Sequence, residues 1–219
     1  MRLLLSGGGN PEQVVDLDIF FSRSIDKNKP ILYIPIAMDK IPYEDCENWF
    51  RSSYKKYGIT NIDLCTDLKN CKDLNMYSAI FIGGGNTFKL LKEIRESSFN
   101  SKLIDYLNNE GFVYGGSAGA IIFGANINTA IHADKNNVNL KDLTGINILN
   151  NYNIWCHYDI KNDKEELSKI EGKTIVLYEE SGVFFDGKNF NSIGKQYEEI
   201  SKELGYDVEI RGEIKNKGD

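Results

Sequence analysis

The sequence predicts an α/β fold of three layers, in which helices cover both faces of an open and mostly parallel β-sheet. Over the first 120 residues, apolar runs short enough for strands alternate with segments of helical spacing, which is the pattern of successive βαβ units. The run 30–37 is apolar almost throughout, as expected for a parallel strand that is buried on both faces. No repeat, linker or change of composition divides residues 1–219, so one domain is predicted.

The N-terminal half is a regular alternation of strands and helices. Its first strand runs into a glycine loop at 7–9, which lacks the third glycine of a dinucleotide-binding fingerprint. The predicted strands are 3–5, 30–37, 62–65, 78–82 and 112–114. The predicted helices are 12–25, 43–57, a segment with helical spacing at Leu90, Leu91 and Ile94, and 100–110.

The helix predicted at 43–57 has identifiable core residues and a clear end. Trp49, Phe50 and Tyr54 are large apolar side chains that are expected to contact the core. Gly58 is expected to stop the helix, because glycine readily adopts the left-handed conformation that follows many helix C-termini.

The pattern loosens after Phe123. Residues 125–150 are rich in Asn and Asp, and 133–137 are expected to form an exposed loop. The charged tail beyond about Ile210 is expected to fray. The elements predicted in between are strands at 152–159 and 174–178, a polar helix at 163–170, and a hairpin over 183–190 whose turn is Asp186-Gly187.

Composition and charge exclude several classes of function. Hydrophobic residues make up 41% of the chain, which is ordinary for a globular protein, and the net charge is −6. The chain therefore lacks the basic surplus that a nucleic-acid or anionic-membrane binder uses. No apolar run has the length of a membrane span, and the apolar stretch at the N-terminus is too short for a signal peptide. A cytoplasmic protein is expected.

The four cysteines are Cys46, Cys65, Cys71 and Cys156. They form no C-x-x-C pair and no regular framework, which predicts reduced thiols. Cys156 is also a candidate nucleophile because it precedes His157, but adjacent strand residues point to opposite faces. A small apolar side chain that fills a strand is the favoured interpretation. The sequence holds no histidine-rich cluster, and neither a metal nor a cofactor is predicted.

The strongest motif is the stretch 112–120, where a short apolar run ends in two glycines, a serine and Ala-Gly-Ala. Gly115, Ser117 and Gly119 occupy the fixed places of the G-x-S-x-G nucleophile elbow, a strand–turn–helix that projects the serine hydroxyl. Small neighbours leave room for a strained backbone, and the helix directs free N–H groups at developing charge. The same residues also fit an ordinary strand-to-helix turn or a phosphate-binding turn.

A serine nucleophile needs a base, which is usually a histidine. The chain contains two histidines, His132 and His157. His132 lies in a polar stretch that is expected to be a solvated loop. His157 is flanked by apolar residues in the predicted strand 152–159, and it is the preferred base. A half-buried histidine that is hydrogen-bonded to the backbone is the alternative interpretation.

Three carboxylates are candidates for the group that orients the base. Asp159 follows His157 by two residues, Asp134 lies in the loop after the elbow helix, and Glu179 ends the strand 174–178. Functional groups collect at the ends of strands in α/β sheets. The residues alone leave the choice open, because each of the three also fits a solvated surface carboxylate.

An acyl-transfer site also needs donors for the oxyanion, usually two backbone N–H groups. Ala118 follows the serine and supplies one. The glycine turn 83–85 ends a neighbouring strand and can supply the other, because glycine allows close approach of the backbone. The same turn also suits a tight strand–helix connection. Asn86 or Thr87 is predicted to cap the helix that follows.

These motifs together resemble a known family. Gly-Gly-Gly-Asn-Thr-Phe-x-Leu-Leu at 83–91, Gly-x-Ser-Ala-Gly-Ala at 115–120 and a downstream histidine are similar to the dipeptidase E and cyanophycinase family of serine peptidases, over roughly residues 1–195. The resemblance implies a flavodoxin-like sheet related to class I glutamine amidotransferases, with serine in place of their cysteine. It implies a site composed of Ser117 as nucleophile, His157 as base, Glu179 as the third member, Asp134 as a further functional aspartate, and the N–H groups of Gly85 and Ala118 as the oxyanion hole.

The resemblance and the motifs predict a serine peptidase that cleaves small peptides through an acyl-enzyme, as a monomer or homodimer and without a cofactor. The chain departs from the best-known family members over 125–160, which include Trp155-Cys156, so the substrate side chain stays open. An amidase or esterase on the same residues is one alternative. A small-molecule binding domain, whose glycine turns hold an anion at helix N-termini, is an alternative of another class.

Overall fold

The structure of the chain is a computed structural model, which describes residues 1–203 and 206–211. The main sheet has seven strands in the order β3-β2-β4-β5-β1-β8-β9. The five strands from β3 to β1 run parallel to one another. β8 pairs antiparallel with β1 on one side and with β9 on the other. Their bounds are β1 Arg2–Ser6, β2 Ile31–Ile34, β3 Ile62–Leu64, β4 Ala79–Ile82, β5 Phe112–Gly116, β8 Ser181–Phe185 and β9 Phe190–Gly194.

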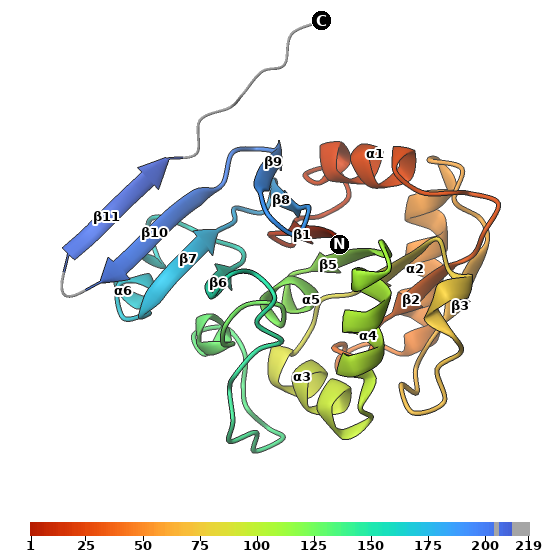
Figure 1. The fold of residues 1–219 in the computed structure, drawn as a ribbon, viewed down its shortest axis with the longest axis horizontal. Coiled ribbons are helices and arrows are strands. Elements are labelled where there is room, and N and C mark those ends of the chain that lie inside the picture. The colour runs from red at the N-terminus through yellow and green to blue at the C-terminus, as the bar shows by residue number, and fades with distance from the viewer. Residues whose placement is uncertain (204–205, 212–219) are drawn as a thin grey trace, which may run out of the picture.

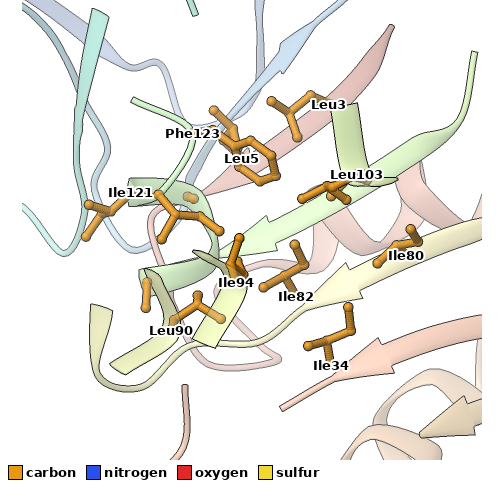
Figure 2. Packing of buried hydrophobic residues seen from close by; sticks show 14 of the residues in the cluster. Leu3, Leu5, Ile34, Ile80, Ile82, Leu90, Ile94, Leu103, Ile121 and Phe123 are labelled. Atoms are coloured by element: carbon orange, nitrogen blue, oxygen red, sulfur yellow. The ribbon is translucent and has the colours of Figure 1, made fainter. Parts of the chain in front are cut away.

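Helices cover both faces of this sheet, as predicted (Figure 1). Successive side chains of a strand point to opposite faces, and the core accordingly divides into two clusters. Leu4 and Tyr114 pack with α1 and α2. Val113 belongs to the cluster on the other face, where Leu5 packs with α3, α4 and α5 (Figure 2). None of the described helices is long and apolar enough to cross a bilayer. The helices on the two faces are α1 Val15–Arg23, α2 Tyr43–Lys55, α3 Thr87–Glu96, α4 Phe99–Asn108 and α5 Ala118–Ile121.

Local signals in the sequence place several element ends correctly. Asn86 caps α3, because its side chain accepts a hydrogen bond from the N–H of Lys89. Gly58 follows the C-terminal turn of α2 with a φ of +76°. The predicted hairpin is formed by β8 and β9, and Gly187 in its turn has a φ of +97°. This hairpin extends the main sheet through the antiparallel pairing of β8 with β1.

One predicted core contact in α2 is wrong. Phe50 and Tyr54 are buried, but Trp49 is 45% exposed. The buried positions of this helix, Cys46, Phe50 and Tyr54, recur every four residues and so form one stripe along it. Trp49 lies beside that stripe and is only partly covered.

The strands predicted at 152–159 and 174–178 do not join the main sheet. They form β6 (Tyr152–Trp155) and β7 (Gly172–Val176), which pair in parallel within a second sheet of order β11-β10-β7-β6. Figure 1 shows this sheet beside the hairpin edge of the main one. Its other strands, β10 (Glu198–Glu203) and β11 (Tyr206–Arg211), were not predicted.

The remaining helices are short. The predicted helix 163–170 is only α6 (Lys164–Leu167), and the 3₁₀ helices η1 (Leu74–Met76) and η2 (Asn128–Ala130) lie in loops. Most of the predicted exposed loop 133–137 is exposed. Of the tail that was predicted to fray, residues 212–219 lie outside the described residues, and Ile210 belongs to β11.

Three glycine turns meet at the carboxyl edge of the parallel strands. β1 leads into 7–9, β4 leads into 83–85, and β5 ends at Gly116 directly before Ser117. Because β5 pairs with both β1 and β4, the three turns are neighbours. Ligand sites of open α/β sheets form at this edge.

Candidate active site

Ser117 occupies the turn between β5 and α5 in a strained conformation. Its φ of +52° and ψ of −114° lie outside the regions that residues with a side chain ordinarily occupy. Its N–H donates to the Ser6 carbonyl at 3.1 Å. A Cβ on Gly115 would lie 2.2 Å from the Gly119 carbonyl oxygen, and one on Gly119 would lie 2.3 Å from that of Ile82. Both flanking glycines are therefore needed for the turn.

His157 is the residue that meets the serine hydroxyl. Ser117 Oγ and His157 Nε2 are 2.8 Å apart. The predicted place of His157 within a strand is wrong, because β6 ends at Trp155 and His157 lies in a turn with a φ of +55°. Its N–H donates to the carbonyl oxygen of Gly7 at 3.0 Å. This bond joins His157 to the first loop of the main sheet and leaves the ring free to reach Ser117.

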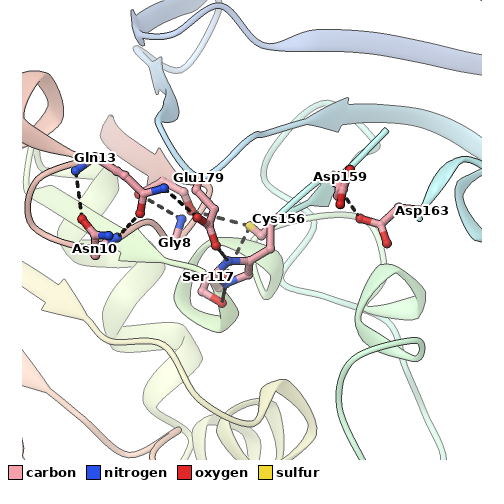
Figure 3. Close-up of polar contacts among 10 residues, drawn as sticks. Gly8, Asn10, Gln13, Ser117, Cys156, Asp159, Asp163 and Glu179 are labelled. Atoms are coloured by element: carbon pink, nitrogen blue, oxygen red, sulfur yellow. Dashed lines mark hydrogen bonds and ion pairs between the residues drawn. The ribbon is translucent and has the colours of Figure 1, made fainter. Parts of the chain in front are cut away.

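Glu179 lies on the other side of the imidazole, in the turn after β7. His157 Nδ1 and Glu179 Oε1 are 3.4 Å apart, and Glu179 Oε2 accepts a hydrogen bond from Gln13 Nε2 at 2.7 Å. Gln13 is fixed in turn, because its Oε1 accepts from the N–H of Asn10 at 2.9 Å. Figure 3 shows Asn10, Gln13 and Glu179 leading towards Ser117. Gln13 was not predicted, and no pattern in the sequence connects it to the motifs.

The glycine loop 7–9 packs against the base and the serine. Gly8 has a φ of +99°, and a Cβ on it would lie 2.4 Å from His157 Cε1 and 2.9 Å from Ser117 Cβ. The N–H of Gly9 donates to the carbonyl oxygen of Glu179 at 3.1 Å. Glycine is required here because the backbone comes so close to the imidazole. This role was also missed, although the loop ends a strand that neighbours the elbow strand.

Asp134 contacts the loop beside the serine and not the imidazole. Its Oδ2 accepts a hydrogen bond from the N–H of Thr87 at 2.8 Å, and Asn86 Nδ2 donates to the Lys135 carbonyl oxygen at 2.8 Å. Negative charge is favourable at a helix N-terminus. Asp134 therefore fixes the start of α3 and, with it, the glycine turn 83–85.

Asp159 and His132 lie away from the serine. Asp159 Oδ2 accepts a hydrogen bond from Asn162 Nδ2 at 2.6 Å, and Figure 3 shows Asp159 apart from Ser117. The exposed His132 ring stacks on Trp155, with ring centroids 4.3 Å apart. Neither residue is placed to act on Ser117.

Several backbone N–H groups near Ser117 have no backbone acceptor among the described residues. Ala118 is the first residue of α5, so its N–H has no acceptor within the helix. Among the described residues, the N–H groups of Gly84 and Gly85 donate to no backbone acceptor. A Cβ on Gly84 would lie 3.2 Å from Ser117 Cβ, which puts this turn against the serine. Gly85 has a φ of +136°, and a Cβ there would lie 2.4 Å from the Ala37 carbonyl group.

Cys156 is placed as a structural residue. Its Sγ lies 3.6 Å from the Ser6 carbonyl oxygen and 3.7 Å from that of Ser117. Burial raises the pKa of the thiol, which keeps it protonated and unreactive at neutral pH. Within the described chain, no group of three or more His, Cys, Asp or Glu side chains is placed to hold a metal ion.

A pocket of about 280 Å³ opens beside Ser117, on the face of the sheet that α1 and α2 cover. Gly8 and Gly84 line it together with the serine, and its described lining residues include no Lys or Arg. Asp18 is the acidic residue among them. The aromatic side chains that line the pocket are Tyr33, Trp49, Tyr54, Phe81 and Tyr114.

Asp18 is a buried carboxylate in this pocket. It is 2% exposed, and its Oδ1 accepts a hydrogen bond from the Tyr54 hydroxyl at 2.7 Å. Burial raises the pKa of Asp18 to about 6, although the Tyr54 hydrogen bond and the charge of Lys56 lower it. None of the ion pairs found among the described residues includes Asp18. The fold therefore keeps an ionisable group on the pocket wall without a cation bonded to it.

Asp18→Asn is expected to stabilise the fold at pH 8 but not at pH 4. The carboxyl pKa rises from 3.8 to about 6 on folding, so folding favours the protonated form. The stability that Asp18 gains from this preference is complete at pH values below its unfolded-state pKa. It is lost as the pH rises through its folded-state pKa. A shift of about 2 pH units corresponds to roughly 3 kcal/mol. Urea unfolding of both proteins at the two pH values measures the difference.

Asp16→Asn is the matched control for this measurement. Asp16 is exposed on the same helix, so its replacement is expected to change the free energy of unfolding by less than about 0.5 kcal/mol at either pH. Equal stabilisation by Asp18→Asn at both pH values would contradict the explanation by a buried charge.

Comparison with known proteins identifies related sequences. Peptidase family S51 matches residues 2–193 of the chain. Peptidase E of Haemophilus influenzae strain Rd is 27% identical over 103 residues, which cover 47% of each chain. An uncharacterized peptidase of Pasteurella multocida is 32% identical over 152 residues, which cover 66% of this chain and 72% of that one. The chain thus spans about half the length of the Haemophilus relatives it matches, 47% and 44% of them.

Two solved structures share the fold. A Listeria monocytogenes protein provisionally described as a peptidase E has a TM-score of 0.72 and 21% identity, over 89% of this chain and 98% of that one. A peptidase from an acI-B1 Actinobacterium has a TM-score of 0.69 and 14% identity, over 96% of this chain and 93% of that one. They agree with the predicted α/β architecture.

A serine in a strained turn at the carboxyl edge of a mostly parallel sheet, facing a histidine, is the arrangement of the α/β serine hydrolases. Within that class the match over 2–193 is specific. The chain belongs to peptidase family S51, the dipeptidase E family of serine peptidases. The family predicted from the motifs at 83–91 and 115–120 is confirmed.

Proposed function

We propose that the protein is a serine peptidase that hydrolyses small peptides, with Ser117 as nucleophile, His157 as general base and Glu179 as the orienting carboxylate. The observation that carries this proposal is the 2.8 Å contact between Ser117 Oγ and His157 Nε2. The strained turn holds the hydroxyl beside the imidazole. A serine in this position can lose its proton to the imidazole as its oxygen attacks a carbonyl carbon.

The proposed reaction proceeds through an acyl-enzyme. Ser117 Oγ bonds to the carbonyl carbon of the scissile peptide bond, and its proton moves to His157 Nε2. The N–H groups of Ala118 and Gly85 stabilise the negative carbonyl oxygen. His157 then protonates the leaving amine, the C–N bond breaks, and an ester remains on Ser117. A water molecule loses a proton to His157 as it attacks the ester carbon, and His157 returns that proton to Ser117 Oγ as the ester C–O bond breaks and the acyl product leaves.

Contacts of the surrounding residues support these roles. Glu179 Oε1 faces His157 Nδ1, and Gln13 holds the other carboxylate oxygen. A carboxylate in this place stabilises the imidazolium and selects the tautomer whose Nε2 accepts a proton. Asp134 acts as a positioning residue, because it fixes the helix start that follows Gly85.

The size of the pocket favours small substrates. A volume of about 280 Å³ beside the serine has room for one residue of a substrate. The related proteins named peptidase E are consistent with a peptide substrate.

Labelling and turnover together test the proposed function. A fluorophosphonate probe is expected to modify Ser117, located by peptide mapping, and the unlabelled protein is expected to hydrolyse members of a dipeptide panel with varied first residues. Absence of both results would contradict the proposal. Labelling with turnover of esters or amides, but of no dipeptide, would favour the amidase or esterase alternative.

Glu179→Gln is expected to reduce kcat by about 100-fold or more with little change in KM. The amide keeps the shape and the contact with Gln13, but it cannot stabilise an imidazolium and can favour the wrong tautomer. Steady-state kinetics on the best dipeptide measure both constants. Asp159→Asn is the control, because Asp159 lies away from the site. A larger loss of kcat in the control would overturn the assignment of Glu179.

A further inference from the structure

The pocket beside the serine connects two features that the proposed mechanism leaves separate. Ser117, where bonds would break, and Asp18, a buried carboxylate of α1, line the same cavity. A substrate whose carbonyl carbon lies at Ser117 Oγ therefore places a neighbouring side chain into a space that has a carboxylate on its wall.

One of the two carboxylate oxygens of Asp18 has a hydrogen-bond donor among the described residues. Asp18 Oδ1 accepts a hydrogen bond from Tyr54, whereas no described residue donates to Oδ2. Asp18 is 2% exposed, and a buried charge is unfavourable unless it is paired. A cation that enters the pocket would supply the missing partner.

The walls of the pocket suit a long cationic side chain. Aromatic rings of Tyr33, Phe81 and Tyr114 line it, and such rings bind both aliphatic stems and cations. Burial raises the pKa values of Tyr54 and Tyr114, so their hydroxyls stay neutral. The described lining includes no Lys or Arg, so an acidic side chain would find no positive partner and would be repelled by Asp18.

We propose that this cavity is a specificity pocket for lysine or arginine on the acyl side of the scissile bond, with Asp18 binding the positive charge. The inference rests on the proposed function, because it names the substrate class on which Ser117 acts. A peptidase with this pocket would differ in specificity from one that prefers an acidic residue on the acyl side of the scissile bond.

Matched dipeptides test the inference. Lys-Leu and norleucyl-Leu differ in the terminal ammonium group, which norleucine lacks, and Asp-Leu carries the opposite charge. The protein is expected to have a kcat/KM for Lys-Leu about 100-fold above that for norleucyl-Leu, with Asp-Leu poorest. In Asp18→Asn this ratio is expected to fall to within a few-fold of one. Titration with the fluorophosphonate counts active sites in each variant, which corrects for any misfolded fraction.

Two further measurements keep the result decisive. Asp16→Asn, an exposed change on the same helix, is expected to retain the full Lys-Leu preference. Calorimetry on Ser117→Ala compares binding of Lys-Leu and norleucyl-Leu without turnover, and tighter binding of Lys-Leu is expected.

The outcomes separate this inference from the proposed function. Hydrolysis of dipeptides with norleucyl-Leu or Asp-Leu preferred over Lys-Leu would overturn the inference and leave the peptidase standing. Equal loss of both activities in Asp18→Asn, with an unchanged ratio, would show a structural role for Asp18 and would also overturn it. Failure of both labelling and hydrolysis would reject the peptidase and the inference with it.

Discussion

Ser117→Ala is expected to abolish peptide hydrolysis, with kcat/KM lower by about 10⁴-fold or more. The change removes one oxygen, the atom that lies 2.8 Å from His157 Nε2. The backbone bond from Ser117 to the Ser6 carbonyl oxygen does not involve that atom. The fold and the pocket are therefore expected to remain. Kinetics on the best dipeptide, fluorophosphonate labelling and the midpoint of thermal unfolding together measure these effects.

Ser52→Ala provides the control for the loss of a hydroxyl. Ser52 is exposed on α2, and its Oγ bonds to the carbonyl oxygen of Trp49 in its own helix. This variant is expected to keep full activity and labelling. Turnover by Ser117→Ala at the level of the unmodified protein would rule out the proposed mechanism.

His157→Ala is expected to lower kcat/KM by about 10³-fold or more, because it removes the ring nitrogen that lies 2.8 Å from Ser117 Oγ and would accept its proton. Fluorophosphonate labelling should slow in parallel, since it requires the same activated hydroxyl. Stopped assays at several pH values, with circular dichroism to confirm folding, measure the loss. The effect should fall mainly on kcat, because the imidazole lies outside the pocket lining.

His132→Ala is the matched control for the base. Its ring stacks on Trp155 at the surface and does not reach Ser117. The change is expected to alter kcat/KM by less than about threefold, as for a surface substitution that touches no functional group. If His132→Ala were inactive and His157→Ala active, the assignment of the base would be reversed.

The fold and the strained turn at Ser117 could be predicted because local chemistry determines them. The stretch 112–120 allows few conformations, since Gly115 and Gly119 have backbone carbonyls where a Cβ would stand. The alternation of strands and helices follows in the same way from apolar periodicity. The second sheet could not be predicted, because β7 pairs with β10, a strand whose sequence is polar and charged.

The arrangement around the base depends on contacts between distant segments. The apolar run through Cys156 and Tyr158 predicts a strand, but His157 leaves it because its N–H bonds to Gly7. The turn at His157 determines which carboxylate faces the imidazole ring. The sequence does not show this turn, so it does not decide which of Asp134, Asp159 and Glu179 orients the ring. The roles of Gly8 and Gln13 likewise appear only once the first loop is packed against the last part of the site.

The candidate site is complete only when the loop 7–9 meets the segment 157–179. His157 follows the serine by 40 residues and Glu179 follows His157 by 22, and both are held by backbone bonds to the loop 7–9. In the proposed mechanism, a growing chain that has reached the elbow has the nucleophile but no base. The proposed hydrolysis is therefore expected only after His157 has been synthesised and its N–H has bonded to the first loop.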